Sequence, residues 1–199
     1  MSEAVRYPEE LAHTVTATDG TPVFVRAIRP ADAERLIAFH IRLSEHTAYQ
    51  RFFTVMKRLP PDWARMLANV DYVKRLALVA EVKTPGGLEL VAVARYELTS
   101  RADTAEVAFV VQDGWQNKGL GTMLLHDLLR AAQARGIHRF SAYVLAANRR
   151  MLDLIARFTT VVERKLDHGV VEATFTAEAP RRGKAAALRT FQGPTGGMS

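Results

Sequence analysis

The segment Gln116-Asn117-Lys118-Gly119-Leu120-Gly121 has the residue types of a phosphate-binding loop. It follows a strand-like run, residues 105–111, and leads into a helical pattern that begins near Thr122. Glycines let the backbone approach a ligand closely, and the free N–H groups of a first helical turn point at an anion, where the helix dipole adds positive charge. Lys118 would add a full charge. We therefore expect a phosphorylated ligand here.

The spacing of this loop differs from both common phosphate-binding signatures. A P-loop places its lysine, followed by Ser or Thr, after the last glycine, whereas Lys118 precedes both glycines. A dinucleotide fingerprint has three glycines and an acidic residue about 20 positions later, and only Gly119 and Gly121 are present. Taken alone, the loop is equally consistent with an ordinary turn before a surface helix.

The composition predicts a globular protein with no membrane partner. The chain has 199 residues, 48% of them hydrophobic and 24% charged, which suits one domain or one domain with a tail. No apolar run approaches the ~18 residues of a membrane span. The acidic N-terminus, with Glu3, Glu9 and Glu10, does not resemble a signal peptide, so we expect a cytoplasmic protein. Because the chain has no cysteine and its histidines lack ligand spacing, no metal is expected.

The positive charge is concentrated at the C-terminal end. Four basic residues and no acidic residue follow Glu178, which leaves only +2 of the net charge of +6 on the rest of the chain. We therefore do not expect the folded part to bind nucleic acid. The composition divides the chain into an N-terminal extension, 1–12, a folded domain, 13–178, and a basic tail, 179–199, predicted to be flexible.

The order of predicted elements indicates an α+β fold. Helices are expected over about 30–43, 44–53, 60–68, 122–135 and 148–158. The hydrophobic patterns predict strands at 14–18, 23–28, 76–82, 88–98, 105–111, 140–145, 161–166 and 170–176. We expect a mixed, mostly antiparallel sheet of about seven strands with helices on both faces, in which the strand–helix–strand unit around the loop supplies the parallel pair.

Glu106 is the candidate catalytic base. Acyl transfer to an amine requires the amine to lose a proton, and a lysine-type amine has a pKa of ~10.4 in water. By the two-residue period of a strand, Glu106 shares one face with Ala108 and Val110. A carboxylate among apolar neighbours is costly without a purpose or a partner. The alternative is an ion pair of Glu106 with Arg95 or another basic residue.

Four segments, 25–32, 43–53, 105–116 and 148–152, together with the element order, resemble the GNAT acetyltransferase superfamily over residues 14–176. In particular, they are similar to bacterial protein-lysine acetyltransferases of the Pat type. The resemblance implies the GNAT fold, acetyl-CoA as cosubstrate and direct attack in a ternary complex. It also implies a protein lysine as acceptor and an acyl-CoA synthetase as a partner; the chain is expected to be a monomer or homodimer. Acetylation of a small amine and a noncatalytic acyl-CoA sensor remain open.

The resemblance also implies roles for individual residues. It places the catalytic glutamate at Glu106, acting directly or through a water. Backbone N–H groups of Val110 and Val111 would hold the pantetheine arm and the oxyanion. Asn148 would contact the coenzyme, although a plain helix N-cap is equally consistent with its position. The pyrophosphate would be bound, chiefly by main-chain N–H groups, at Gln116, Asn117, Lys118, Gly119, Leu120, Gly121 and Thr122.

The chain departs from the family pattern at one catalytic position. Ile155 stands where many GNAT enzymes carry a tyrosine that protonates the departing thiolate. Tyr143 is a possible substitute, although we predict a packing role for it. Three aromatic side chains are expected to do no chemistry: Phe52 and Phe53 pack on the sheet, and Trp115 supports the loop. Arg149 and Arg150 are expected to form a solvated basic face, with contact to a coenzyme phosphate as the alternative.

Overall fold

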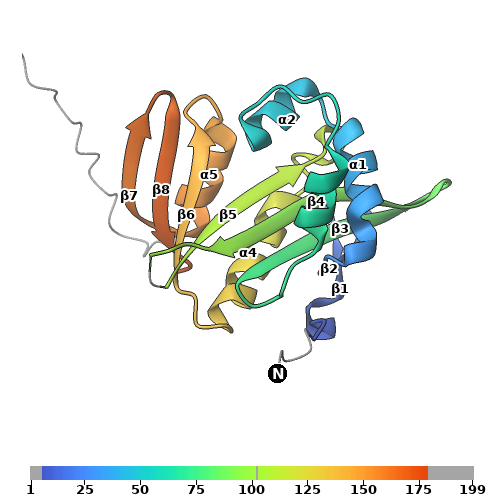
Figure 1. Cartoon of the computed structure of the whole chain (residues 1–199), viewed down its shortest axis with the longest axis horizontal. Helices are drawn as coiled ribbons and strands as arrows, with labels where there is room; N and C mark the ends of the chain where they lie inside the picture. Colours follow the sequence, from blue (N-terminus) through green and yellow to red (C-terminus); the bar gives the residue numbers. More distant parts are fainter. Residues whose placement is uncertain (1–5, 102, 179–199) are drawn as a thin grey trace, which may run out of the picture.

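The computed structural model describes residues 6–101 and 103–178, and Figure 1 shows its arrangement. The predicted basic tail, 179–199, lies outside the described residues, as do residues 1–5 of the predicted extension. The described part of that extension packs on the domain, because the Tyr7 hydroxyl donates to the carbonyl of Ala27 at 2.8 Å. None of the described helices is long and apolar enough to cross a membrane.

One sheet of eight strands forms the frame, in the order β1-β2-β3-β4-β5-β6-β8-β7 (Figure 1). Every neighbouring pair is antiparallel except β5 with β6. The predicted mixed sheet is confirmed, and it has eight strands because both strands of the first hairpin join it. The strands are β1 (His13–Thr16), β2 (Pro22–Ala27), β3 (Arg75–Thr84), β4 (Gly87–Leu98), β5 (Thr104–Val111), β6 (Arg139–Leu145), β7 (Thr160–Asp167) and β8 (Val170–Thr176).

Helices cover both faces of the sheet, as predicted (Figure 1). The first face carries α1 (Ala33–Ile41), α2 (Glu45–Phe52) and α3 (Pro61–Ala68). The opposite face carries α4 (Leu120–Gln133), with α5 (Arg149–Phe158) beside it. Short 3₁₀ turns η1 (Glu9–Leu11), η2 (Pro30–Asp32) and η3 (Asp113–Trp115) precede β1, α1 and the glycine loop.

Local sequence signals fix where the helices near the loop begin. Ser44 caps α2, because its hydroxyl accepts the N–H of Thr47 at 3.1 Å. Asn148 caps α5 in the same way, through the N–H of Met151 at 3.2 Å. Gly119 precedes α4 in the left-handed region, with φ of 83°, which favours glycine because other side chains are strained there. The backbone therefore turns sharply from the loop into α4.

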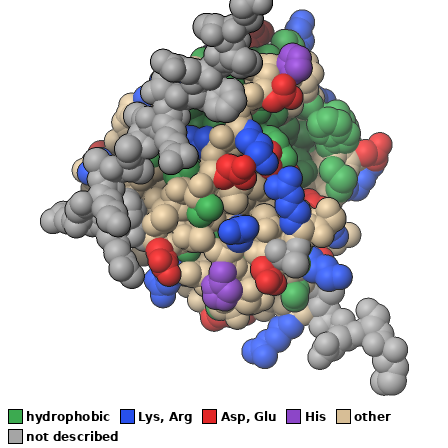
Figure 2. All heavy atoms as spheres, turned by 90° about the vertical axis from the view of Figure 1, so that its left-hand side faces the viewer, with side chains coloured by type: hydrophobic (Ala, Val, Ile, Leu, Met, Phe, Trp, Pro, Cys, Tyr) green, Lys and Arg blue, Asp and Glu red, His purple; other side chains and the backbone are tan. Residues whose placement is uncertain are grey.

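The central strands and α4 make the core. Most residues of β3 and β4 are buried on both faces, as expected for strands covered by helices on each side. Three leucines of α4, Leu124, Leu125 and Leu128, are at most 1% exposed. At the edge of the sheet, β7 is exposed along nearly its whole length. Figure 2 shows acidic and basic side chains interspersed on this side of the molecule, and charges of this kind protect an open edge from pairing with another chain.

The parallel pair β5 and β6 separates after a short contact. Its pairing covers only Thr104 to Glu106 of β5 with Arg139 to Ser141 of β6. Beyond Glu106, β5 continues to pair with β4 as far as Val111, while β6 pairs with β8 as far as Leu145. The two strands therefore diverge in the middle of the sheet, and a site can form between them.

Candidate active site

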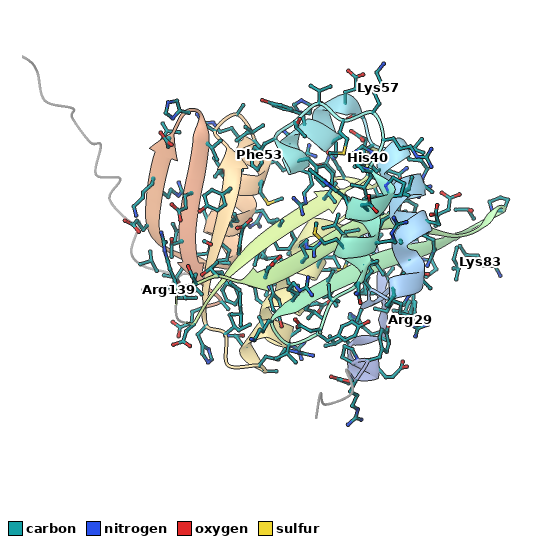
Figure 3. All side chains as sticks on the ribbon, viewed as in Figure 1. Arg29, His40, Phe53, Lys57, Lys83 and Arg139 are labelled. Carbon is teal, nitrogen blue, oxygen red and sulfur yellow. The ribbon has the colours of Figure 1, made fainter. Side chains whose placement is uncertain are left out.

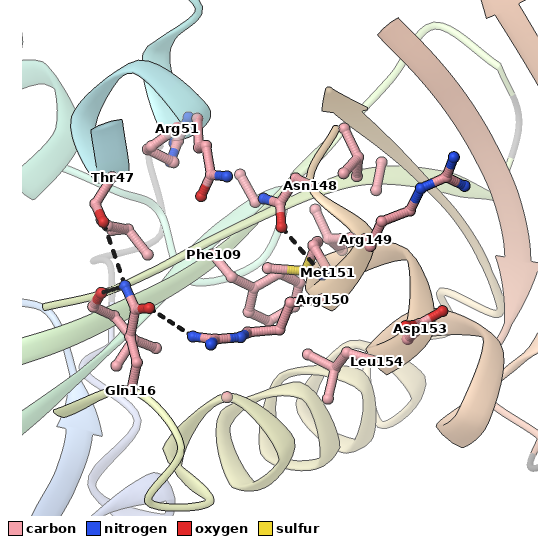
Figure 4. Close-up of a pocket in the computed structure, with 18 of the residues that line it drawn as sticks. Thr47, Arg51, Phe109, Gln116, Asn148, Arg149, Arg150, Met151, Asp153 and Leu154 are labelled. Carbon is pink, nitrogen blue, oxygen red and sulfur yellow. Dashed lines mark hydrogen bonds between the residues drawn. The ribbon is translucent and has the colours of Figure 1, made fainter. Parts of the chain in front are cut away.

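A cleft of about 1030 Å³ opens where β5 and β6 diverge. Its walls are β5 from Glu106 to Val111, the glycine loop, the first turns of α5 and part of α2. Figure 4 shows Thr47 and Arg51 of α2 facing the cleft, with Asn148 to Leu154 of α5 on its other side. The cleft thus brings together Glu106, the loop and Asn148, which are far apart in the sequence.

Along β5, the backbone N–H groups point alternately toward β4 and toward the cleft. The N–H of Gln112 donates to the carbonyl of Val91 on the β4 side at 2.9 Å. Because an antiparallel ladder alternates, the N–H of Val110 also turns toward β4, whereas those of Val111 and Phe109 turn toward the cleft. The carbonyl of Val111 fits this pattern, since it accepts the side-chain amide of Gln116 at 3.0 Å. Free N–H groups were expected at Val110 and Val111; by this alternation they lie at Val111 and Phe109.

Gln116 connects three walls of the cleft (Figure 4). Its amide nitrogen lies 3.0 Å from the carbonyl oxygen of Val111 on β5 and 3.3 Å from the hydroxyl of Thr47 on α2. Its amide oxygen accepts the guanidinium of Arg150 on α5 at 2.6 Å. Arg150 and Arg149 therefore line the cleft and do not form only the solvated face that was predicted. A guanidinium next to the loop adds the full positive charge that phosphate binding favours.

Lys118 is paired with an acidic residue beside the loop. Its ammonium lies 2.9 Å from the carboxylate of Asp19 and 4.3 Å from the centre of the Trp115 ring. The Lys118 hydrogen bond holds the pKa of Asp19 well below its usual range. Gln116, Asn117, Gly119, Gly121 and Thr122 line the cleft, whereas the side chains of Lys118 and Leu120 are not among the described residues that do. Leu120 is buried, but its N–H belongs to the free first turn of α4.

Glu106 lies in the cleft with its carboxylate unpaired. It is exposed to solvent there, and within residues 6–101 and 103–178 it makes no hydrogen bond or ion pair. The predicted alternative, an ion pair with Arg95, is therefore not seen. The protein around it desolvates the carboxyl group and raises its pKa, while the charge of Arg51 partly offsets that rise. A carboxylate with a raised pKa and no partner is suited to accept a proton.

Three further side chains near the base differ in their roles. Asn148 lines the cleft and also caps α5, so the predicted N-cap is confirmed. Ile155 is 1% exposed in the core and carries no acid. Tyr143 lines the cleft and is 46% exposed, so the packing role predicted for it is wrong. Burial and the nearby charges of Glu172 and Glu106 raise the pKa of Tyr143, which keeps its hydroxyl protonated.

The two phenylalanines at the end of α2 differ in burial. Phe52 packs against the core as predicted. Phe53 is in the left-handed region, with φ of 55°, and is 39% exposed on the cleft wall, so its predicted packing on the sheet is wrong (Figure 3). Among the described residues, no group of three His, Asp or Glu side chains is placed to hold a metal ion.

The family model of the acetyltransferase (GNAT) family matches residues 43–159, the region that contains this cleft. The chain belongs to the GNAT acetyltransferase family. The family and the enzyme class predicted from the sequence, an N-acetyltransferase, are thus confirmed.

Relatives of this GNAT acetyltransferase include Pat-type proteins. An acetyltransferase of Pseudomonas aeruginosa is 33% identical over 75% of this chain and 80% of its own length. The acetyltransferase Pat of Mycolicibacterium smegmatis is 35% identical over 79% of this chain, which spans 46% of that relative. The crystal structure of the GNAT domain of S. lividans PAT superposes with a TM-score of 0.77 at 37% identity, covering 86% of this chain and 99% of that domain.

One part of the GNAT site was missed by the sequence analysis. Asp113 lies just before the loop and accepts three hydrogen bonds from the start of α2. They come from the N–H and the hydroxyl of Ser44, at 2.9 and 2.7 Å, and from the hydroxyl of Thr47, at 2.7 Å. The helix that lines the cleft opposite α5 is thereby fixed to the loop. The only sequence signal was an N-cap serine, which does not reveal a partner so distant in the chain.

Proposed function

We propose that this GNAT acetyltransferase moves an acetyl group from acetyl-CoA to a lysine of a protein, by direct attack in a ternary complex. The observation that carries the proposal is the single cleft that joins a helix N-terminus suited to phosphate with an unpaired carboxylate of raised pKa. Similarity to Pat from M. smegmatis and to the GNAT domain of S. lividans PAT supports a protein acceptor.

The donor would lie between the loop and β5. The free N–H groups of Leu120, Gly121 and Thr122, together with Arg150, would hold the pyrophosphate. The cleft-facing N–H groups of Phe109 and Val111 would pair with the pantetheine arm and with the oxyanion that forms at the thioester. The thioester would then lie beside Glu106, because Glu106 is on the same strand as Phe109 and Val111.

Glu106 would start the reaction by taking a proton from the lysine ammonium, directly or through a water. The amine then attacks the carbonyl carbon, and the C–N bond forms as the C–S bond breaks. The nitrogen releases its second proton and the departing thiolate takes one up to leave as a thiol. Tyr143 lines the cleft and stays protonated, so its hydroxyl is a candidate donor to the sulfur. A thiol with a pKa near ~8.5 is a tolerable leaving group even without it.

Identification of the acceptor tests this proposal. The protein would be incubated with acetyl-CoA and three acceptors in separate reactions: an acyl-CoA synthetase, lysine peptides and a panel of small amines. Thiol release and acceptor mass would be followed. We expect an added acetyl group on protein or peptide lysine. Transfer only to small amines would favour the small-molecule alternative. Tight CoA binding with no turnover on any acceptor would favour the sensor.

A further inference from the structure

Two arginines beside Glu106 have no counter-charge of their own. Arg51 lies on α2 and Arg95 on β4, and in the described chain neither guanidinium makes a hydrogen bond or ion pair. The guanidinium carbon of Arg51 lies 5.0 Å from the centre of the Phe52 ring. By contrast, Arg26 and Arg35 on the same side of the sheet are both paired with Asp32 and Glu81. The guanidinium groups of Arg51 and Arg95 therefore keep their hydrogen-bond donors available for a ligand.

The two arginines approach the base from different elements. On β4 and β5, Glu97 is opposite Glu106 and Arg95 is opposite Ala108. Because directly opposite residues share a face, Arg95 is the diagonal neighbour of Glu106, within reach of a long side chain. Arg51 reaches the cleft from α2 above that face, apart from the Gln116–Arg150 hydrogen bond at the loop (Figure 4). The pair thus lies at the end of the cleft away from the phosphate-binding loop.

A small cavity adjoins the cleft at this point. It has a volume of about 30 Å³ and lies between α1, α2 and the sheet. Its lining is mostly apolar, and its polar lining residues are Arg51, Arg95 and His40. His40, labelled in Figure 3, is 3% exposed, and neither of its ring nitrogens has a hydrogen-bond partner. Arg51 and Arg95 thus border the same largely apolar space, and their two unpaired guanidinium groups are near enough to act on one anionic group.

Nearby charges shift the pKa values of Arg51 and Arg95, but among the described residues no carboxylate forms an ion pair with either. Desolvation, together with the charge of Arg95, lowers the pKa of Arg51 to about 10. Desolvation also lowers the pKa of Arg95, and the charges of Glu97 and Glu106 oppose that shift. Neither glutamate lies within ion-pair distance of Arg51 or Arg95 among the residues described. Partly desolvated cations are costly unless a partner supplies hydrogen-bond acceptors.

We propose that Arg51 and Arg95 bind a carboxylate of the acceptor, the side chain of an aspartate or glutamate that flanks the target lysine. This inference rests on the proposed function and adds the acceptor's local chemistry. The donor phosphates are assigned to the opposite end of the cleft, so the group that reaches Arg51 beside Glu106 belongs to the acceptor. A guanidinium has five N–H donors and no acceptor, which matches a carboxylate in two-point geometry.

Matched peptides test this directly. Heptapeptides with one central lysine would carry glutamate, or its uncharged isostere glutamine, at each flanking position in turn. The ratio of kcat/KM for the two peptides would be measured at one pH by thiol release. We expect the wild type to favour glutamate at one or more positions by about tenfold, and Arg51→Met or Arg95→Met to bring the ratio close to one. The ratio is taken within one enzyme, so a change in Glu106 protonation cancels.

The control is Arg65→Met on α3, where the arginine is 64% exposed and pairs with Asp62, so the same chemical change should leave the preference intact. If Arg95→Met does not fold, Arg51→Met on the cleft wall carries the test. Equal rates for both peptides in the wild type, or a preference that survives Arg51→Met, would overturn the inference while leaving lysine acetylation in place. A preference for succinyl-CoA over acetyl-CoA that is lost in Arg51→Met would assign the carboxylate to the acyl group instead. Failure to acetylate any peptide or protein would refute the proposed function itself.

Discussion

Glu106 is the residue on which the proposed chemistry depends. Glu106→Gln removes the carboxylate charge but keeps the size and shape of the side chain. Because the base is lost, we expect kcat to fall by about 10²–10⁴, while CoA binding is retained. Because burial raises its pKa, the wild-type rate should rise with pH through a value above that of an ordinary glutamate, and this limb should vanish in the variant. Steady-state rates across pH and calorimetric titration with CoA would measure both.

The matched control is Glu163→Gln on β7, an exposed carboxylate that lies 3.3 Å from the ammonium of Lys165 outside the cleft. It should behave as the wild type. An unchanged rate in Glu106→Gln would show that another group, or water alone, takes the proton.

His40 should make stability depend on pH. Burial lowers its pKa in the folded protein, whereas the unfolded value is ~6.5. The unfolded state then binds more protons, so the free energy of unfolding is highest above the unfolded pKa and decreases as pH falls through the folded pKa. Urea denaturation at pH 7 and pH 5 would show this loss. We expect His40→Leu to reduce the loss and His138→Gln, at an exposed position, to leave it unchanged. Equal losses in all three proteins would contradict the assignment.

At the scale of elements, the turn into α4 depends on one backbone conformation. Gly119 has φ of +83°, which costs a residue with a Cβ about 1–2 kcal/mol. Steric clash is not the problem, because a Cβ added at Gly119 would lie 3.5 Å from the Thr18 methyl, an ordinary van der Waals contact. Gly119→Ala should therefore reduce the free energy of unfolding by about that amount and weaken CoA binding as the N–H groups shift. Chemical denaturation and calorimetry would measure the two effects.

Gly114→Ala is the matched control, because no neighbouring atom lies within 4 Å of the added Cβ and its φ is not left-handed. We expect little change in CoA affinity there. If both variants bound CoA as well as the wild type, the conformation at Gly119 would not be what positions the donor.

At the scale of the whole molecule, a buried ionic network joins the first hairpin to the centre of the sheet. Arg26 on β2 makes two hydrogen bonds to Asp32, at 2.7 and 2.8 Å, and also contacts Glu81 on β3. Arg35 on α1 binds the same two carboxylates. The network therefore fixes β2, α1 and β3 together, on the face of the sheet that carries α1.

Asp32→Ala should be strongly destabilising, because it leaves Glu81 as the one remaining carboxylate of the network to neutralise two guanidinium groups. We expect a loss of about 3–5 kcal/mol in the free energy of unfolding, measured by urea denaturation. Asp62→Ala removes an exposed carboxylate, 88% accessible and paired only with Arg65, and should cost less than about 1 kcal/mol. Similar losses in the two variants would mean that the network contributes no more than a surface ion pair.

Much of this architecture was predictable from local sequence patterns. The period of apolar residues located the strands and helices, because a half-buried element must repeat its apolar side chains at the spacing of its backbone. A helix cap was one of the two roles expected for Asn148, and the glycines of the loop indicated the turn into α4. The separation of β5 from β6 depends on which strands they pair with, and those partners are remote in the sequence.

The sequence by itself determined the fold class, the family and the loop for the donor, because these depend on residues close together in the chain. Only the tertiary structure decided which charges are paired: Lys118 with Asp19, Arg150 with Gln116, and Arg51 and Arg95 with no partner in the described chain. Charge pairing depends on distances between elements that are remote in sequence, and local periodicity carries no information about those distances. The proposal for the donor therefore rests on the loop, which the sequence reveals, while the proposal for the acceptor rests on the unpaired arginines beside Glu106, which only the fold reveals.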